Sequence, residues 1–232
     1  MKRPILERLI AERDAGAAVA LVTDLESGRQ ALVFADRCEG ELPVDAATAL
    51  QAREATARER GGTVDTPAGR LFVHPFCPPV RLIVVGAVHI AEPLSQIAVV
   101  AGYRVTLVDP RRAFASRSSF EGVTVLDDWP DEALERLRPD PRTAVVTLTH
   151  DPKLDDAALD AALRSPAFYV GALGSRKTHA ARRHRLARRG FSDSELARIH
   201  GPVGLDIGAV LPAEIAVSIL ADIIRARRRA TG

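Results

Sequence analysis

Residues 80–112 read VRLIVVGAVHIAEPLSQIAVVAGYRVTLVDPRR, and this stretch decides the fold. Its first six residues, 80–85, are apolar and mostly β-branched, and Arg81 is the only interruption. A short apolar run of this kind predicts a strand that is buried on both faces, as strands in a parallel sheet are. Gly86 follows directly and predicts a tight turn at the end of this strand.

A helix and a second strand follow the turn. Residues 91–101 predict the helix, and Gly102 is typical of a helix terminator. Residues 103–108 predict the second strand, which ends at Asp109. Strand, helix and strand together make a βαβ unit of about 30 residues, the building block of a dinucleotide-binding sheet.

The turn matches a dinucleotide-binding fingerprint only in part. Against G-x-G-x-x-G/A, Gly86 and Ala91 fit, but Val88 occupies the position of the middle glycine, where a side chain crowds a pyrophosphate. Asp109 lies 23 residues after Gly86, where a carboxylate can hold a ribose hydroxyl. The alternative interpretation is a simple tight turn at Gly86 and a turn or capping residue at Asp109.

Composition excludes several classes of protein. The chain has 232 residues, 47% of them hydrophobic, a net charge of +2 and only 4% aromatic residues. That balance shows no polyanion signal and no stacking platform for nucleic acid, so we expect no nucleic-acid partner. Cys38 and Cys77 form no CxxC pair, which favours a reducing compartment. No signal-peptide core and no 18-residue apolar run occur, so we expect a cytoplasmic protein without a membrane span.

Two domains are predicted. Residues 1–77 alternate short strands and helices, as in a small α/β domain, and prolines at 75, 78 and 79 mark the boundary. Residues 80–232 alternate strand and helix throughout, which predicts a Rossmann-like, doubly wound parallel sheet. The expected fold class is therefore α/β, with a C-terminal Rossmann-like domain behind a small N-terminal α/β domain.

Residues with binding chemistry follow three of the predicted strands, and the carboxyl ends of those strands form the ligand crevice of such a sheet. They are Gly86 and His89 after the first strand, His150 after the fourth, and Gly171, Gly174, Ser175 and Arg176 after the fifth.

A predicted helix begins at about Ser175, directly after Gly174. Its first amides, with Arg176, suit a phosphate or pyrophosphate; the alternative is a serine N-cap followed by a solvated basic face. The remaining cations of this helix are expected to be solvated or to contact a partner. They are Arg182, Arg183, Arg185, Arg188 and Arg189.

Other candidates have equally ordinary alternatives. His89 and His150 suit acid–base chemistry or contact with a soft metal centre, although a lone histidine is often structural. Asp206 stands in a glycine-rich stretch, residues 199–216, where it would bind a pterin ring or a hydroxyl, or simply make a turn. The spacing of Asp151, Lys153, Asp155 and Asp156 superficially resembles a metal site, but the lysine argues against Ca²⁺, and helix capping is the expected role. No nucleophile elbow, Walker loop or zinc signature occurs, so no catalytic residue and no metal site are assigned, and enzymatic activity stays open.

Several stretches resemble the XdhC/CoxI family, the accessory proteins of molybdenum hydroxylases, over residues 81–220. They are GAVHIAEPL, GYRVTLVDPR, THDPKLDD, FYVGALGSRKTHAARRHRL and ARIHGPVGLDIGAVLPAEIAVSILADII. The resemblance implies a cofactor chaperone that binds the molybdenum cofactor, assists its sulfuration and delivers it to a xanthine dehydrogenase-like or CO dehydrogenase-like apoenzyme. A cysteine desulfurase would be a further partner. The glycine-rich cysteine motif of longer members is absent; Cys38 stands in RCEGELP, a poor match.

On this basis the pterin phosphate, or the pyrophosphate of a dinucleotide form, would rest near Gly174 and Ser175 and be gripped by Arg176. His89 and His150 would face the molybdenum or dithiolene end, and Asp206 would meet the pterin. The first alternative is an NAD(P)-dependent oxidoreductase that uses Gly86 and Asp109. A second alternative is a structural adaptor between a sulfurtransferase and the apoenzyme. An apolar helix face near residues 215–224 would pair two copies in a homodimer.

Overall fold

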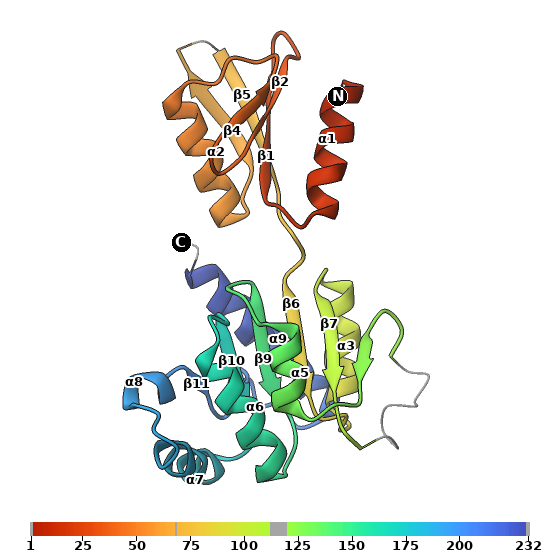
Figure 1. The fold of residues 1–232 in the computed structure, drawn as a ribbon, viewed down its shortest axis with the longest axis vertical. Coiled ribbons are helices and arrows are strands. Elements are labelled where there is room, and N and C mark those ends of the chain that lie inside the picture. The colour runs from red at the N-terminus through yellow and green to blue at the C-terminus, as the bar shows by residue number, and fades with distance from the viewer. Residues whose placement is uncertain (1, 68, 112–119, 231–232) are drawn as a thin grey trace. The chain divides into compact units, whose positions relative to one another are not determined.

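The structure is a computed structural model that describes residues 2–67, 69–111 and 120–230. The chain divides into two compact units, of which the first ends at Pro78 and the second spans Pro79–Ala230 (Figure 1). The confirmed fold class is α/β, with an antiparallel sheet in the first unit and a parallel sheet in the second.

The first unit is built on a five-stranded antiparallel sheet in the order β3-β2-β1-β5-β4. Its elements are α1 (Arg3–Asp14), β1 (Val19–Asp24), β2 (Gln30–Val33), β3 (Cys38–Gly40), α2 (Ala46–Arg58), β4 (Gly62–Thr66) and β5 (Gly69–Phe76). A hairpin joins β1 to β2, and in its turn Asp24 accepts a hydrogen bond from the Glu26 amide. β4 was not predicted, because its glycine resembles a helix stop.

Each face of this sheet carries one helix. Ala49 and Ala52 of α2 pack with Val22 and Val73 of the strands. Leu9 of α1 belongs to a separate cluster, formed with the strand residues that face the other side of the sheet. The alternation of the two clusters along β1 follows from the two-residue period of a strand.

The second unit holds a six-stranded, all-parallel sheet in the order β11-β10-β9-β6-β7-β8. Its strands are β6 (Arg81–Val85), β7 (Arg104–Val108), β8 (Thr124–Leu126), β9 (Thr143–Thr147), β10 (Tyr169–Ala172) and β11 (Ile199–His200). Numbered from β6, this is the Rossmann order 3-2-1-4-5-6, with the switch point between β6 and β9. The predicted doubly wound sheet is confirmed, although the two-residue β11 was too short to be predicted.

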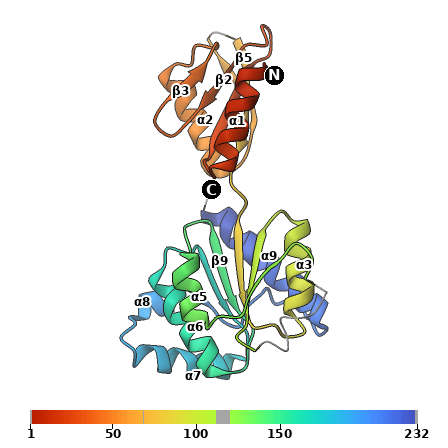
Figure 2. The same cartoon turned by 45° about the vertical axis from the view of Figure 1, so that its right-hand side comes forward.

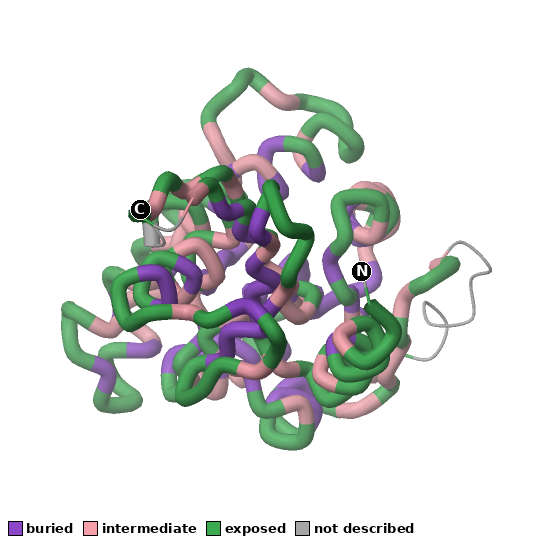
Figure 3. Tube along the Cα trace, turned by 90° about the horizontal axis from the view of Figure 1, so that it is seen from above, coloured by how far each residue is buried: buried purple, intermediate pink, exposed green. Residues whose placement is uncertain are grey.

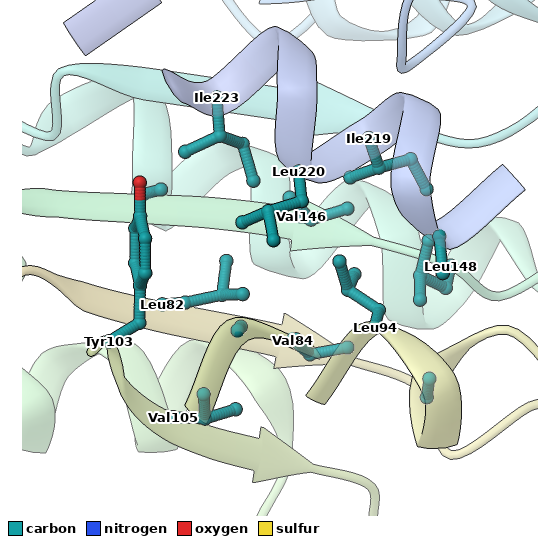
Figure 4. Packing of buried hydrophobic residues seen from close by; sticks show 14 of the residues in the cluster. Leu82, Val84, Leu94, Tyr103, Val105, Val146, Leu148, Ile219, Leu220 and Ile223 are labelled. Atoms are coloured by element: carbon teal, nitrogen blue, oxygen red, sulfur yellow. The ribbon is translucent and has the colours of Figure 1, made fainter. Parts of the chain in front are cut away.

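Helices cover both faces of the parallel sheet (Figure 2). They are α3 (Ala91–Val100), α5 (Pro130–Leu137), α6 (Pro152–Arg164), α7 (Arg176–Ala187), α8 (Asp193–Leu196) and α9 (Pro212–Ala230). Leu94 of α3 and Ile219 of α9 pack on one face with Leu82 and Val84 of β6 (Figure 4).

The other face of the sheet packs against α5, α6, α7 and α8. Ile83 and Val85 of β6 belong to this second cluster, together with Leu159 of α6 and Leu186 of α7. Because neighbouring residues of β6 face opposite layers and all but the half-buried Arg81 are buried, the prediction of a strand buried on both faces is confirmed. Figure 3 shows how buried and exposed residues follow one another along the trace.

The arginines of the basic helix α7 were predicted to be solvated or to contact a partner, and two of them do neither. Arg182 is only 1% exposed and reaches Asp155 of α6, and Arg185 pairs with Asp156. Of the aspartates expected to cap a helix, Asp151 caps α6 by accepting from the Lys153 amide, whereas Asp155 and Asp156 pair with arginines instead. The expectation for Arg182 and Arg185 was therefore wrong, because these cations pair with aspartates of another helix that periodicity could not place.

Of the helices within the described ranges, none combines the length and the apolar character that crossing a bilayer requires.

Candidate functional site

Four loops leave the carboxyl edge of the parallel sheet, where ligands of such folds bind. They are residues 86–90 after β6, 148–151 after β9, 173–175 after β10 and 201–211 after β11. β6 pairs directly with β9, and β9 pairs with β10, so the first three loops are neighbours. The sequence predicted the first three; the fourth follows a strand it did not reveal.

The turn after β6 requires glycine. Gly86 has a φ of +103°, and a Cβ at this position would lie 2.4 Å from Cγ2 of Thr149. Its amide donates to the Val108 carbonyl at 2.8 Å, which ties the turn to the end of β7. The turn therefore packs directly on the loop after β9.

Asp109 was interpreted either as a carboxylate for a ribose hydroxyl or as a turn or capping residue, and in the structure its carboxylate is fully buried and bonded within the chain. One oxygen accepts from the Ala87 amide at 2.6 Å and from Nη2 of Arg111 at 2.7 Å; the other accepts from the amide and Nε of Arg111, each at 2.9 Å. Burial acts to raise the pKa of Asp109, yet the hydrogen bonds from Arg111 and Ala87 outweigh it and lower this pKa. In this structure Asp109 braces the turn after β6.

His89 and His150 are both exposed, one in the loop after β6 and the other in the loop after β9. Because those strands are neighbours, the two histidines stand at the same edge of the sheet. Among the described residues, no three of the types His, Cys, Asp and Glu gather closely enough to hold one metal ion.

The turn into α7 carries four of the predicted site residues. Ser175 is the N-cap of α7 and accepts a hydrogen bond from the Thr178 amide at 3.2 Å. Arg176 is the first helical residue and is exposed. Gly174 lies directly before the cap. Gly171 lies buried inside β10, and the side chains of Val203 and Tyr169 fill the space where its own would stand.

A cavity of about 370 Å³ lies beside the start of α7. Its wall comes from Arg176, from the loop after β11 and from the first turns of α9. Asp206 lines the same cavity, so the structure brings together two of the predicted residues. The remaining seven predicted residues are not part of this wall.

Sequence reasoning missed two residues around this loop. Ser218 of α9 lines the cavity, and its carbonyl accepts from the Leu205 amide at 3.1 Å, which fixes the loop on the helix. His179 of α7 packs under Gly201, where an added Cβ would meet Nδ1 at 2.2 Å. Burial, together with Arg182 and Arg183, lowers the pKa of His179. Neither position carries a motif; the spacing of Arg176 and His179 by three residues was the only signal.

The parallel sheet, its Rossmann strand order and the ligand-sized cavity at its carboxyl edge define a Rossmann-type binding domain. The family model described as the XdhC Rossmann domain matches residues 82–223. The chain therefore belongs to the XdhC family, and the resemblance seen in the sequence is confirmed.

Two curated relatives and one solved structure are similar over most of this chain. The "Molybdenum cofactor insertion chaperone PaoD" of Escherichia coli is 32% identical over 66% of this chain and 42% of its own length. A protein of Bacillus subtilis, named as a probable xanthine dehydrogenase subunit, is 33% identical over 68% of this chain and 46% of its own. The crystal structure of a xanthine dehydrogenase from Bacillus halodurans matches 98% of this chain and 65% of its own, with a TM-score of 0.76 and 26% identity. The chain thus spans less than half the length of these curated relatives.

Proposed function

We propose that this protein is an accessory protein that binds the molybdenum cofactor as cargo and assists its insertion into a molybdenum hydroxylase apoenzyme. The observation that carries the proposal is the cavity shared by Arg176 and Asp206 at the carboxyl edge of the sheet. Support comes from the family and from the name of the Escherichia coli relative, a molybdenum cofactor insertion chaperone.

The cavity fits the chemistry of this cargo. A volume of about 370 Å³ falls within the range of small-molecule pockets. The guanidinium of Arg176 suits the pterin phosphate, and the first amides of α7 add donors where the helix dipole favours an anion. The carboxylate of Asp206, on the same wall, would accept hydrogen bonds from the N–H groups of the pterin.

His89 and His150 belong to the proposal as contacts for the metal end of the cargo. Both are exposed on neighbouring loops beyond the cavity wall. Cargo that extended from Arg176 across β10 and β9 would reach these loops. In a dinucleotide form, the pyrophosphate would take the place of the phosphate at Arg176.

The loop after β11, which forms part of the cavity wall, carries exposed apolar side chains that suit a protein partner at the mouth of the cavity. Ile207 lines the cavity, and Val210 and Leu211 follow it along the same loop; all three are exposed. Cargo has to leave through this mouth, so we propose that the recipient apoenzyme covers it through an apolar surface of its own.

Sulfuration and the remaining partners are finer parts of the same proposal. A cysteine desulfurase would have to reach the cargo at the exposed histidines. A second copy of this chain would pair through the outer face of α9, which exposes Val217 and Ile224. In an antiparallel pair, Glu214 near one end of this face would lie opposite Arg228 near the other.

The second candidate function, an NAD(P)-dependent oxidoreductase, needs Asp109 as the acceptor for a ribose. Both oxygens of this carboxylate are bonded to Arg111 and Ala87, so a ribose would have to displace one of them. The order of the strands is the observation that favours this candidate.

Titration with purified molybdenum cofactor and, separately, with NAD(P) tests the proposal. We expect the cofactor to bind and Arg176→Ala to weaken binding about tenfold or more, because a charge-assisted contact to phosphate is lost. Arg188→Ala is the matched control, since Arg188 is an exposed cation at the other end of α7. Binding of NAD(P) without the cofactor, or equal losses in the two variants, would contradict the proposal.

A further inference from the structure

Two neighbouring ion pairs join α6 to α7. Asp155 pairs with Arg182 at 3.1 Å, and Asp156 pairs with Arg185 at 2.6 Å. Both aspartates are buried, but among the described residues only the first pair also contacts the loops at the carboxyl edge of the sheet. The second pair is therefore a natural control for the first.

Arg182 reaches the turn that precedes α7. Its Nη2 donates both to Oδ2 of Asp155 at 3.1 Å and to the carbonyl of Leu173 at 2.7 Å. Leu173 is followed at once by Gly174, Ser175 and Arg176, so this contact anchors the turn that presents Arg176 to the cavity.

Asp155 extends the same contact to the loop after β9. Its Oδ1 accepts a hydrogen bond from Oγ1 of Thr149 at 2.7 Å. The methyl group of Thr149 lies against Gly86, where a Cβ would come within 2.4 Å. One chain of contacts, buried except at the half-buried Leu173, thus links the loops that follow β6, β9 and β10.

Stability alone does not account for this pair. Nε and Nη1 of Arg182 are buried and have no hydrogen-bond partner within the described residues, which is costly for a charged group. Burial raises the pKa of Asp155 against the opposing effects of Thr149 and Arg182. Buried ion pairs are often no more stable than apolar pairs of the same volume, and their best-attested use is to fix one arrangement of the chain.

We propose that Arg182 is a positioning residue for the cargo site: through Leu173 and Asp155 it fixes the turn that aims Arg176 into the cavity. This inference rests on the proposed function for its cargo, but its effect on the turn does not depend on any ligand.

Hydrogen exchange of the free protein tests the positioning role without a ligand. The test variant is Asp155→Leu/Arg182→Met, which replaces the pair by apolar side chains; the control is Asp156→Leu/Arg185→Met. The reporters are the amides of Leu173, Thr178 and His179, which donate to Thr147, Ser175 and Ser175 respectively. We expect exchange at these amides to rise about tenfold in the test variant and to stay near the wild-type rate in the control. Equal rates in wild type and test variant would overturn the proposal.

A test variant that does not fold, as judged by circular dichroism, is replaced by Arg182→Lys. Lysine keeps one charged donor for Asp155 but lacks the planar fork of arginine. We expect exchange at the three amides to lie between the wild-type and Asp155→Leu/Arg182→Met rates or, where the latter is not measurable, above the wild-type rate. The positioning role would be contradicted if Arg182→Lys left the exchange rates of the three amides unchanged while it shifted the melting temperature as much as the control Asp156→Leu/Arg185→Met does.

Binding of purified molybdenum cofactor provides the second readout. We expect the Kd of the test variant to rise about tenfold, and to rise less than about threefold when the same change is made in an Arg176→Ala background, because coupled residues are not additive. Additive losses would overturn the positioning role. A wild-type protein that does not bind the cofactor would instead refute the proposed function, while the exchange experiment still decides the role of Arg182.

Discussion

The carboxylate of Asp109, at the end of β7, accepts a hydrogen bond of 2.6 Å from the backbone amide of Ala87, in the turn after β6. The two residues are 22 positions apart and fully or nearly buried. A position that a dinucleotide-binding fingerprint would assign to a ribose is occupied here by a contact within the protein.

Asp109→Asn should destabilise the protein by about 1–3 kcal/mol at pH 7, since the buried amide of Ala87 and the guanidinium of Arg111 lose a charged acceptor. The pKa of Asp109 is lowered in the folded state, so its contribution is present above the unfolded pKa of about 4 and is lost as the pH falls through the folded value. Urea unfolding between pH 7 and pH 2 should therefore show the wild type and the variant converging in acid. A difference that stays constant with pH would contradict the ionic role.

Gly86→Ala should destabilise the second unit strongly, because the new Cβ would clash with Thr149 and the backbone is left-handed. Overpacking costs about 1–3 kcal/mol and the left-handed conformation adds about 1–2 kcal/mol. Gly102→Ala separates the two causes, because Gly102 has a φ of +84° but no atom within 4 Å of the place that a Cβ would take. Equal free energies of unfolding for both variants would show that the contact with Thr149 is unimportant.

Val210→Asp should slow transfer of the cofactor to a molybdenum hydroxylase apoenzyme while leaving cofactor binding within about twofold of wild type. Val210 is 79% exposed in the loop after β11, next to Ala209 of the cavity wall, but does not itself line the cavity. A buried charge in an apolar contact is unfavourable, which is the physical reason for the expected loss. Val100→Asp, on the 89% exposed Val100 of α3, is the control. The activation of apoenzyme over time measures this effect. Identical activation rates for Val210→Asp and Val100→Asp would show that the mouth of the cavity is not a docking surface.

Tyr169→Phe should cost about 1.5–3 kcal/mol of stability, because the buried hydroxyl donates to Oδ2 of Asp222 at 2.7 Å and this acceptor is charged. Tyr103→Phe is the matched control: within the described ranges the hydroxyl of Tyr103 is buried without a hydrogen-bond partner. Because an unpaired buried hydroxyl carries an uncompensated desolvation cost, its removal should leave the free energy of unfolding unchanged or raise it by about 1–3 kcal/mol. Thermal or urea unfolding of both variants compares them, and similar losses would refute the assignment.

Much of the fold was predictable because the determinants are local. The alternation of apolar runs and helical stripes after residue 80 identified the parallel sheet, and Gly86 marked the first turn. Short edge strands such as β11 were not predicted, because two residues are too few to show the periodicity of a strand. In the first unit β4 escaped because a glycine begins it and polar residues alternate along it.

The candidate site was predictable only as a set of residues. Arg176 and Asp206 were singled out separately, one for the start of a helix and the other for its glycine-rich surroundings. Their common cavity depends on the loop after β11, which the sequence did not place. Ser218 and His179 had no motif, because their part in this region comes from packing against that loop.

The sequence by itself determined the Rossmann-type half of this protein and its family. Strand periodicity, turn glycines and the long stretches that match the family are all local features of the sequence. Only the tertiary structure decided that Asp109 braces a turn, that Arg182 is buried between helices and that Arg176 and Asp206 share one wall. The physical reason is that these contacts join residues about 10 to 30 positions apart, and strand order and helix packing, rather than local preference, determine which of them meet.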